Sequence, residues 1–174
     1  MPARLHLLLG ACCLALAVTL ACVGCSHYRM GTGAPLAFKT LYVAPVSSEA
    51  LAPQARAIVG ARIRESFIRD GRVTLVSSSE EADATLRVTL KHYGREATVS
   101  KASDAGLARK FSLTLQAECT LTTRDGRDLF SARKLQAQQE AYVDSGQLQS
   151  EYETLPYLAD QLARDVTHAT LDTW

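Results

Sequence analysis

Cysteine and histidine are the side chains of this sequence best suited to act as nucleophiles, bases or metal ligands. Four of the five cysteines, Cys12, Cys13, Cys22 and Cys25, lie within the first 25 residues. The fifth, Cys119, falls in an alternating apolar series, which predicts a buried thiol. His27, His92 and His168 are far apart, no cysteine or histidine pair has metal-ligand spacing, and no serine lies in a Gly-x-Ser-x-Gly motif. The sequence therefore predicts no catalytic residue and no metal site.

The N-terminal cysteines follow a segment that is typical of an export signal. Arg4 gives a positive start, and the 17 residues Leu7–Val23 carry no charge. Cys22-Val23-Gly24-Cys25 resembles the bacterial lipobox, which predicts cleavage before Cys25 and a diacylglycerol thioether on its sulfur. Cys22 is a second candidate for that lipid. An uncleaved membrane anchor is an alternative, although a spanning helix needs about 20 apolar residues.

This processing defines the predicted organisation. Residues 1–24 would be a lipoprotein signal peptide, 25–36 a lipidated tether, and 37–174 a single α+β domain. With Cys25 carrying the diacylglycerol and an N-acyl chain, Cys119 would have no disulfide partner, and the sequence predicts no other cofactor. The 19 basic and 18 acidic residues nearly balance, which argues against a nucleic-acid partner.

After the tether, the pattern predicts a strand, a helix and a second strand parallel to the first. The first strand is Phe38–Val46, and the second is Arg72–Ser77. The helix between them is capped by Ser47 or Ser48 and runs from about Pro53 to Arg69, with one apolar face.

Two stretches of alternating apolar and polar residues predict further strands. The first opens at Ala82–Leu86 and continues to Lys91, and a long connection, Gly94–Lys110, follows it. The second alternating strand is Phe111–Thr122.

Asp125-Gly126 predicts a two-residue hairpin turn that pairs Leu121 with Phe130 and Glu118 with Arg133. Beyond that point the apolar residues of the two strands fall out of register. We therefore expect a β-bulge near Arg133-Lys134 that places Leu135 and Ala137 opposite Leu115 and Leu113; the strand ends by about Val143.

The last segment carries a helical apolar stripe from Leu155 to Ala169. Ser150 and Glu153 resemble a capping box, and Pro156 either limits the helix to a start near Leu155 or kinks a longer one. The order β-α-β-β-β-α predicts an α+β sandwich with two helices packed on one face of a mixed sheet of four to five strands.

From Cys25 to Trp174 the chain resembles the LptE family of lipopolysaccharide-assembly lipoproteins. The matching features are the opening strand-helix-strand order and four short segments: 24–28 (GCSHY), 82–86 (ADATL), 125–127 (DGR) and 158–163 (LADQLA). The resemblance implies a non-enzymatic protein, lipid-anchored at the periplasmic face of the outer membrane. It also implies a large LptD-like β-barrel partner and contact with lipopolysaccharide, and Ser26 agrees with outer-membrane sorting.

In that family, basic residues on the middle strands and their connection are implicated in lipid contact. The best-matching positions are Lys101 in the connection and Arg133 in the last strand, and Arg95, Arg109 and Lys110 lie close to Lys101 in the sequence. Guanidinium and ammonium groups suit the phosphates of lipid A. The alternative for Arg133 is a solvated cross-strand pair with Glu118.

A second functional class stays open. An envelope lipoprotein could instead regulate a periplasmic cell-wall enzyme by binding it. Such a protein usually needs a long tether, whereas Ser26–Pro35 spans at most roughly 35 Å when extended. Membrane attachment through the lipid is expected in either case.

Overall fold

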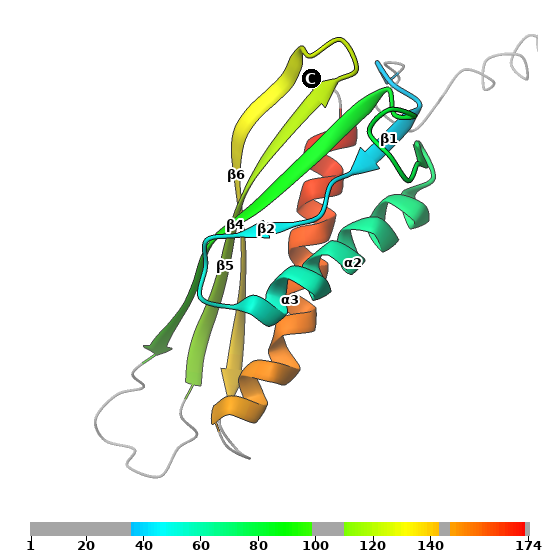
Figure 1. The fold of residues 1–174 in the computed structure, drawn as a ribbon. Helices are drawn as coiled ribbons and strands as arrows, with labels where there is room; N and C mark the ends of the chain where they lie inside the picture. Colours follow the sequence, from blue (N-terminus) through cyan, green and yellow to red (C-terminus); the bar gives the residue numbers. More distant parts are fainter. Residues whose placement is uncertain (1–35, 99–109, 143–146, 173–174) are drawn as a thin grey trace, which may run out of the picture. The chain divides into compact units, whose positions relative to one another are not determined.

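A computed structural model describes residues 36–98, 110–142 and 147–172, which all lie in one compact unit, Leu36–Trp174. Residues 1–35, with Cys25, and residues 99–109, with Lys101, lie outside the described residues, and the predicted division into leader, tether and domain stays a prediction. The elements, shown in Figure 1, are β1 (Thr40–Val43), β2 (Ser47–Ser48), α2 (Pro53–Asp70), β3 (Thr74–Leu75), β4 (Ala84–Thr98), β5 (Lys110–Thr123), β6 (Asp128–Tyr142) and α3 (Gln147–Leu171).

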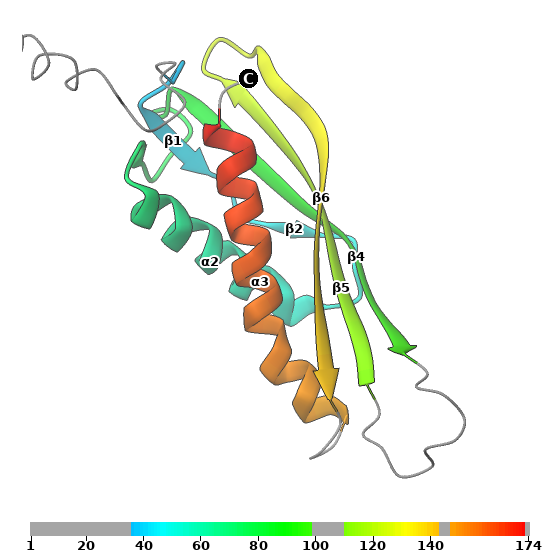
Figure 2. The same cartoon turned by 180° about the vertical axis from the view of Figure 1, so that it is seen from behind.

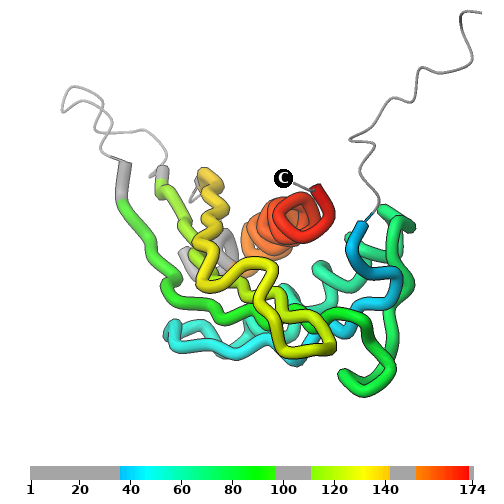
Figure 3. The backbone as a smooth tube through the Cα atoms, turned by 90° about the horizontal axis from the view of Figure 1, so that it is seen from above, coloured from blue at the N-terminus to red at the C-terminus, as the bar shows by residue number. Residues whose placement is uncertain are grey.

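The strands form one mixed sheet in the order β3-β1-β4-β5-β6, and β2 pairs with β4. β1 is parallel to β3 and β4, whereas β4, β5 and β6 form an antiparallel meander. Both helices lie on the same side of this sheet (Figures 1 and 2), and Figure 3 shows α3 on one side of β4 to β6. The predicted α+β class, element order and one-sided helix layer are confirmed, although the sheet has six strands.

The additional strand replaces the predicted helix cap. Ser47 and Ser48 form β2 and pair with Thr89 and Leu90, so the prediction that they cap the helix was wrong. The two serines continue the parallel pairing with β4. The N-cap residue of α2 is therefore Ala52, whose side chain makes no capping hydrogen bond. Pro53 suits the first turn of α2 because its nitrogen carries no hydrogen, so this position has no N–H group that would need a cap.

The core fills the space between the helices and the inner face of the sheet. α2 contributes a stripe of residues with no exposed surface, and α3 contributes a second stripe that packs against β5, β6 and α2. The largest of these side chains are Ile63, Phe67, Leu155, Leu158 and Leu162. Because the stripes recur every three or four residues, each helix has one face toward the core and one toward solvent.

Arg72 ties together the C-terminal ends of the two helices. Its guanidinium lies 2.8 Å from Asp70 Oδ1 and 3.0 Å from Asp172 Oδ1. Arg72 Nη1 also donates to the backbone oxygen of Leu171 at 3.3 Å. A cation at this place neutralises two carboxylates and binds a terminal carbonyl of α3.

The β4–β5 hairpin is longer than its sequence pattern predicts. The predicted connection began at Gly94, but β4 continues to Thr98, which pairs with Lys110 at the start of β5. A bulge at Lys91 absorbs one residue, and pairing then continues with Tyr93 opposite Leu115. The prediction was wrong because Gly94 was interpreted as a strand end. Gly94 instead lies within β4, where the absence of a side chain leaves space for the His92 ring.

The β5–β6 turn and register also differ from the prediction. Gly126 has φ +84° and its N–H donates to the Thr123 oxygen at 3.0 Å. The Thr123 N–H donates to the Arg127 oxygen at 2.8 Å, so the loop has three residues, 124–126, rather than two. Leu121 pairs with Phe130 as predicted. The bulge, however, lies at Ala132, which has φ +49° and falls between the paired residues Phe130 and Arg133.

This earlier bulge changes the pairing of the rest of β6. Ala137 pairs with Leu115 rather than Leu113, and Glu118 pairs with Lys134 rather than Arg133. The predicted partners after the bulge were therefore wrong. A slip of one residue in the register moves a side chain to the other face of the sheet. Because the bulge lies before Arg133, this residue pairs with Cys119 and faces the opposite side from the predicted one.

α3 begins earlier than Leu155. It starts at Gln147, contains Pro156, and places Ser150 inside the helix, so the predicted capping box was wrong. Proline removes one helical hydrogen bond, here to the carbonyl of Tyr152. Burial of Leu155 and Leu158 on either side of Pro156 compensates this loss.

Candidate functional site

Of the two predicted lipid-contact residues, the structure describes only Arg133. Lys101 lies outside the described residues, and the strand ends that flank its connection, Thr98 and Lys110, pair with each other. Arg133 pairs with Cys119, which is nine residues along β5 from Lys110. At about 3.3 Å per residue this separation is roughly 30 Å. Arg133 therefore lies far along the hairpins from the strand ends Thr98 and Lys110.

Arg133 lies on the helix-facing side of the sheet. Its cross-strand partner Cys119 is buried, and Arg133 itself is half-buried. The guanidinium donates from Nη1 to the backbone oxygen of Ala169 at 2.9 Å, and its central carbon lies 5.3 Å from the centre of the Phe130 ring. Arg133 thus satisfies a carbonyl in the last turn of α3. The predicted pair with Glu118 is wrong, and lipid contact by Arg133 stays a prediction.

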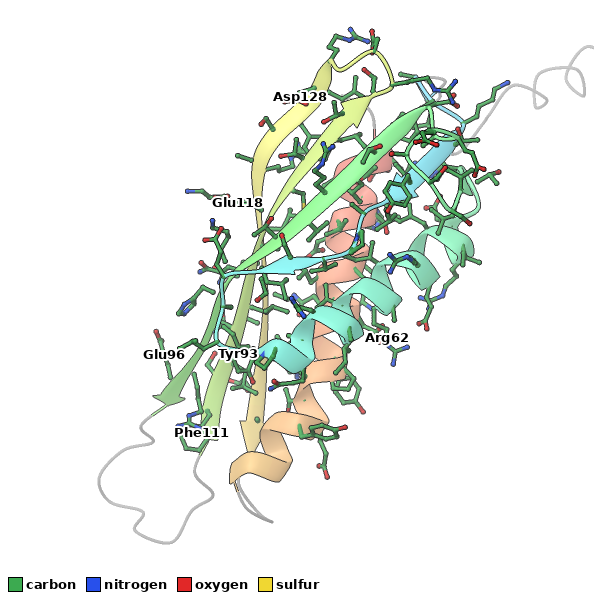
Figure 4. All side chains as sticks on the ribbon, in the orientation of Figure 1. Arg62, Tyr93, Glu96, Phe111, Glu118 and Asp128 are labelled. Atoms are coloured by element: carbon green, nitrogen blue, oxygen red, sulfur yellow. The ribbon has the colours of Figure 1, made fainter. Side chains whose placement is uncertain are left out.

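The opposite face of the sheet carries a groove of about 450 Å³ between β4, β5 and β6. Its charged lining residues are Lys91, Glu118 and Lys134, and Figure 4 shows Glu118 pointing away from the helices. Lys91 Nζ lies 2.6 Å from Glu49 Oε2 and 3.8 Å from Glu118 Oε2. The hydrogen bond to Glu49 raises the pKa of Lys91, so this lysine stays charged. Neither Lys91 nor Lys134 was a predicted site residue, because their position on one face depends on the observed register.

Side-chain hydrogen bonds cross this outer face from β5 to β6. Gln116 donates to Gln136 at 3.0 Å, and Gln138 donates to Ser112 Oγ at 2.6 Å. Amides and hydroxyls therefore dominate the middle of the face. Such a surface suits water or a polar partner rather than the interior of a membrane.

A second cluster lies where β4 and β5 approach the connection that contains Lys101. The guanidinium carbon of Arg95 lies 5.3 Å from the centre of the Phe111 ring. Tyr93 is on the same inner face, whereas Glu96 points to the other face (Figure 4). An exposed arginine next to an aromatic ring combines a cation with apolar surface, which is the chemistry expected for a phosphorylated lipid.

Asp83, in the family-like segment 82–86, has a structural role. Its Oδ2 accepts hydrogen bonds from the backbone N–H groups of Thr40 at 3.0 Å and Lys39 at 3.1 Å. These two hydrogen bonds lower the pKa of Asp83, and the bond from Thr40 has the larger effect. Arg124 donates to the backbone oxygen of Ala82 at 2.9 Å and so ties the β5–β6 turn to the same corner.

The titratable groups considered for catalysis are separated. Cys119 is buried as predicted, and burial raises the pKa of its thiol to about 12. His92 lies on β4, and His168 lies on α3, where it contacts Asp172 at 2.9 Å. Within residues 36–98, 110–142 and 147–172, no three His, Cys, Asp or Glu side chains converge on a metal position.

None of the helices in the described part of the chain has the length and apolar character needed to cross a membrane.

The fold is shared with solved structures, among them two lipoproteins. The minor lipoprotein from Acinetobacter baumannii matches with a TM-score of 0.53 at 17% identity, over 79% of this chain and 96% of that one. Rare lipoprotein B from Shewanella oneidensis matches with a TM-score of 0.50 at 16% identity, over 77% and 95%. Protein XCC0632 from Xanthomonas campestris matches with a TM-score of 0.53 at 13% identity, over 83% and 90%. At these identities the likeness shows the fold alone.

A search of curated proteins gave no match. A family model does match: LptE, described as lipopolysaccharide-assembly, covers residues 38–170. The matched region runs from just before β1 to the last turn of α3 and includes every strand of the sheet.

Proposed function

Because the chain belongs to the LptE family of lipopolysaccharide-assembly lipoproteins, we propose that it partners a large LptD-like β-barrel in lipopolysaccharide transport. It would do so as a non-enzymatic protein at the periplasmic face of the outer membrane. The observation that carries this proposal is the family match over residues 38–170. The shared fold of the Acinetobacter and Shewanella lipoproteins supports it at the level of architecture.

The membrane attachment is proposed from the sequence. Cleavage before Cys25 would expose its amino group and sulfur to an N-acyl chain and a diacylglycerol thioether. Two or more acyl chains on one residue hold a protein stably on a bilayer, since each buried CH₂ contributes about 0.8 kcal/mol. No other cofactor is part of the proposal.

The outer sheet face supports a barrel partner. Transmembrane β-barrels have polar interiors, so a protein that sits within one needs a polar, hydrogen-bonded surface. The Gln116–Gln136 and Ser112–Gln138 bonds and the Lys91–Glu49 pair provide such a surface.

Lipopolysaccharide contact is proposed for Lys101 and Arg133, as in the sequence analysis. The Arg95–Phe111 pair supports the connection end of the β4–β5 hairpin as the first contact, because its guanidinium is exposed beside an aromatic ring. Arg133, whose guanidinium is bound to the Ala169 carbonyl, would act only after giving up or sharing that bond.

The test is co-purification of the acylated full-length chain from detergent-extracted envelopes, followed by mass spectrometry of bound proteins. We expect a large outer-membrane β-barrel in amounts close to stoichiometric. Cys25→Ala should lose fatty-acid label and membrane attachment, whereas the matched change Cys22→Ala should keep the label. A chain that retrieves a cell-wall enzyme instead of a barrel would contradict the proposal.

A further inference from the structure

A groove of about 250 Å³ lies between α2 and α3 near their C-terminal ends, on the helical side of the fold. Each helix contributes three side chains to its lining. These are Ser66, Arg69 and Asp70 from α2, and Arg164, Thr167 and His168 from α3. The lining therefore combines two guanidinium groups, an imidazole and two hydroxyls with a single carboxylate.

The two arginines of the groove have unused hydrogen-bonding capacity. Arg69 and Arg164 are exposed, and neither makes a hydrogen bond or an ion pair with any other described residue. Arg64, which is also on α2, instead donates to two backbone oxygens at 3.1 Å. Since a guanidinium carries five N–H donors, the two arginines together offer a ligand ten donors and two positive charges.

The carboxylates at this end of the helices are already neutralised by another arginine. The guanidinium of Arg72 lies 2.8 Å from Asp70 Oδ1 and 3.0 Å from Asp172 Oδ1. His168 Nδ1 lies 2.9 Å from Asp172 Oδ2, which leaves Nε2 as the ring nitrogen available to a ligand. The groove thus keeps the positive charge of its own two arginines.

Hydroxyl groups join the two helices within the groove. Thr167 is buried, and its Oγ1 lies 2.8 Å from Ser66 Oγ and 2.9 Å from the backbone oxygen of Ala163. The backbones that carry the two arginines are therefore fixed by helix packing rather than by a loop. A site on such rigid elements loses less conformational entropy when it binds.

We propose that this groove binds the phosphate group of a phosphomonoester between Arg69 and Arg164. A phosphomonoester has three terminal oxygens and nearly two negative charges, so it can accept hydrogen bonds from both guanidinium groups. A carboxylate has only two oxygens, which one arginine already satisfies. The phosphate could be free or could belong to a lipid head group. The proposal rests on the two helices and does not depend on a barrel partner.

The first test titrates the acylated full-length chain, in non-ionic detergent micelles, with inorganic phosphate at constant ionic strength. The readout is the shift of the arginine Nε–H resonances by NMR. Arg69→Gln and Arg164→Gln should each weaken binding about 10-fold, because each removes charge-assisted hydrogen bonds. Arg56→Gln is the matched control, since Arg56 is an exposed arginine of α2 about 20 Å from Arg69 along the helix.

The two groove variants should unfold at the wild-type temperature, because neither arginine bonds to the described chain. Loss of binding would then reflect the site and not the fold. Shifts no larger than those caused by chloride at the same ionic strength would overturn the proposal. Equal weakening of phosphate binding by Arg56→Gln would also overturn it.

The second test distinguishes a free phosphate from a lipid head group. Phosphatidate, a lipid with a phosphomonoester head group, is added to the same micelles in place of inorganic phosphate. Binding at least 10-fold tighter than that of inorganic phosphate, and lost in Arg69→Gln with Arg164→Gln, would assign the groove to a lipid. Equal affinity for the two probes would assign it to free phosphate. Phosphatidate binding that survives the double substitution would place the phosphate elsewhere and refute the proposed site.

Discussion

Replacing Arg133 by alanine tests whether this arginine holds α3 to the sheet. The change removes the hydrogen bond from Nη1 to the Ala169 oxygen at 2.9 Å and the stacking on Phe130 at 5.3 Å. A hydrogen bond from a charged donor contributes about 1.5–3 kcal/mol, and a cation–π contact about 0.5–1 kcal/mol near the surface. Since the two overlap in one side chain that is half-exposed, we expect a loss of about 2 kcal/mol.

The assay is thermal and urea unfolding of the chain with intact and substituted Arg133. For a domain of this size, 1 kcal/mol shifts Tm by about 2–4 °C, so Arg133→Ala should lower Tm by about 4–8 °C. Arg133→Lys should lie between the two, because lysine keeps the charge but lacks the planar fork of donors. Arg87→Ala is the matched control, as Arg87 is exposed and donates a long hydrogen bond to Thr122 Oγ1 at 3.5 Å.

A Tm change below 1 °C for Arg133→Ala would refute the structural role assigned to this residue. The outcome also decides how lipid-binding data should be interpreted. If Arg133→Ala lowers both stability and lipopolysaccharide binding, the loss of binding has to be compared with that of a destabilised variant that keeps Arg133.

Three further predictions use other parts of the fold. Because hydrogen bonds from Thr40 and Lys39 lower the pKa of Asp83, its carboxylate stabilises the folded chain above about pH 4, and this contribution is lost as pH falls through the lowered pKa. Asp83→Asn should therefore lower the urea midpoint at pH 7 more than at pH 3. Gly126→Ala should cost about 1 kcal/mol in urea unfolding, because φ is +84° there. Cys119 should react with maleimide only after unfolding, since burial raises its pKa to about 12; rapid native labelling would contradict its placement.

The sequence predicted well those elements whose pattern extends over many residues. The apolar stripe of α2 and the alternation of β5 each involve local rules that tertiary contacts reinforce. β2 was missed because two serines before a helix satisfy a capping pattern, and only their pairing with β4 distinguishes the alternatives.

The candidate site was less predictable because it depends on register. The non-glycine residue Ala132 adopts φ +49°, a conformation that no sequence pattern indicates at that position. Moving the bulge from Arg133-Lys134 to Ala132 reverses the face on which Arg133 lies. Lys134 then takes the outer position that the prediction had assigned to Arg133.

Arg72 joins residues that are 100 positions apart, because its guanidinium binds Asp172 just after the last turn of α3. The final helix also supplies one complete wall of the core. Until α3 has been synthesised, α2, β5 and β6 lack these packing partners. Because these contacts join α3 to segments that are distant in the sequence, this unit completes its folding only once α3 is available.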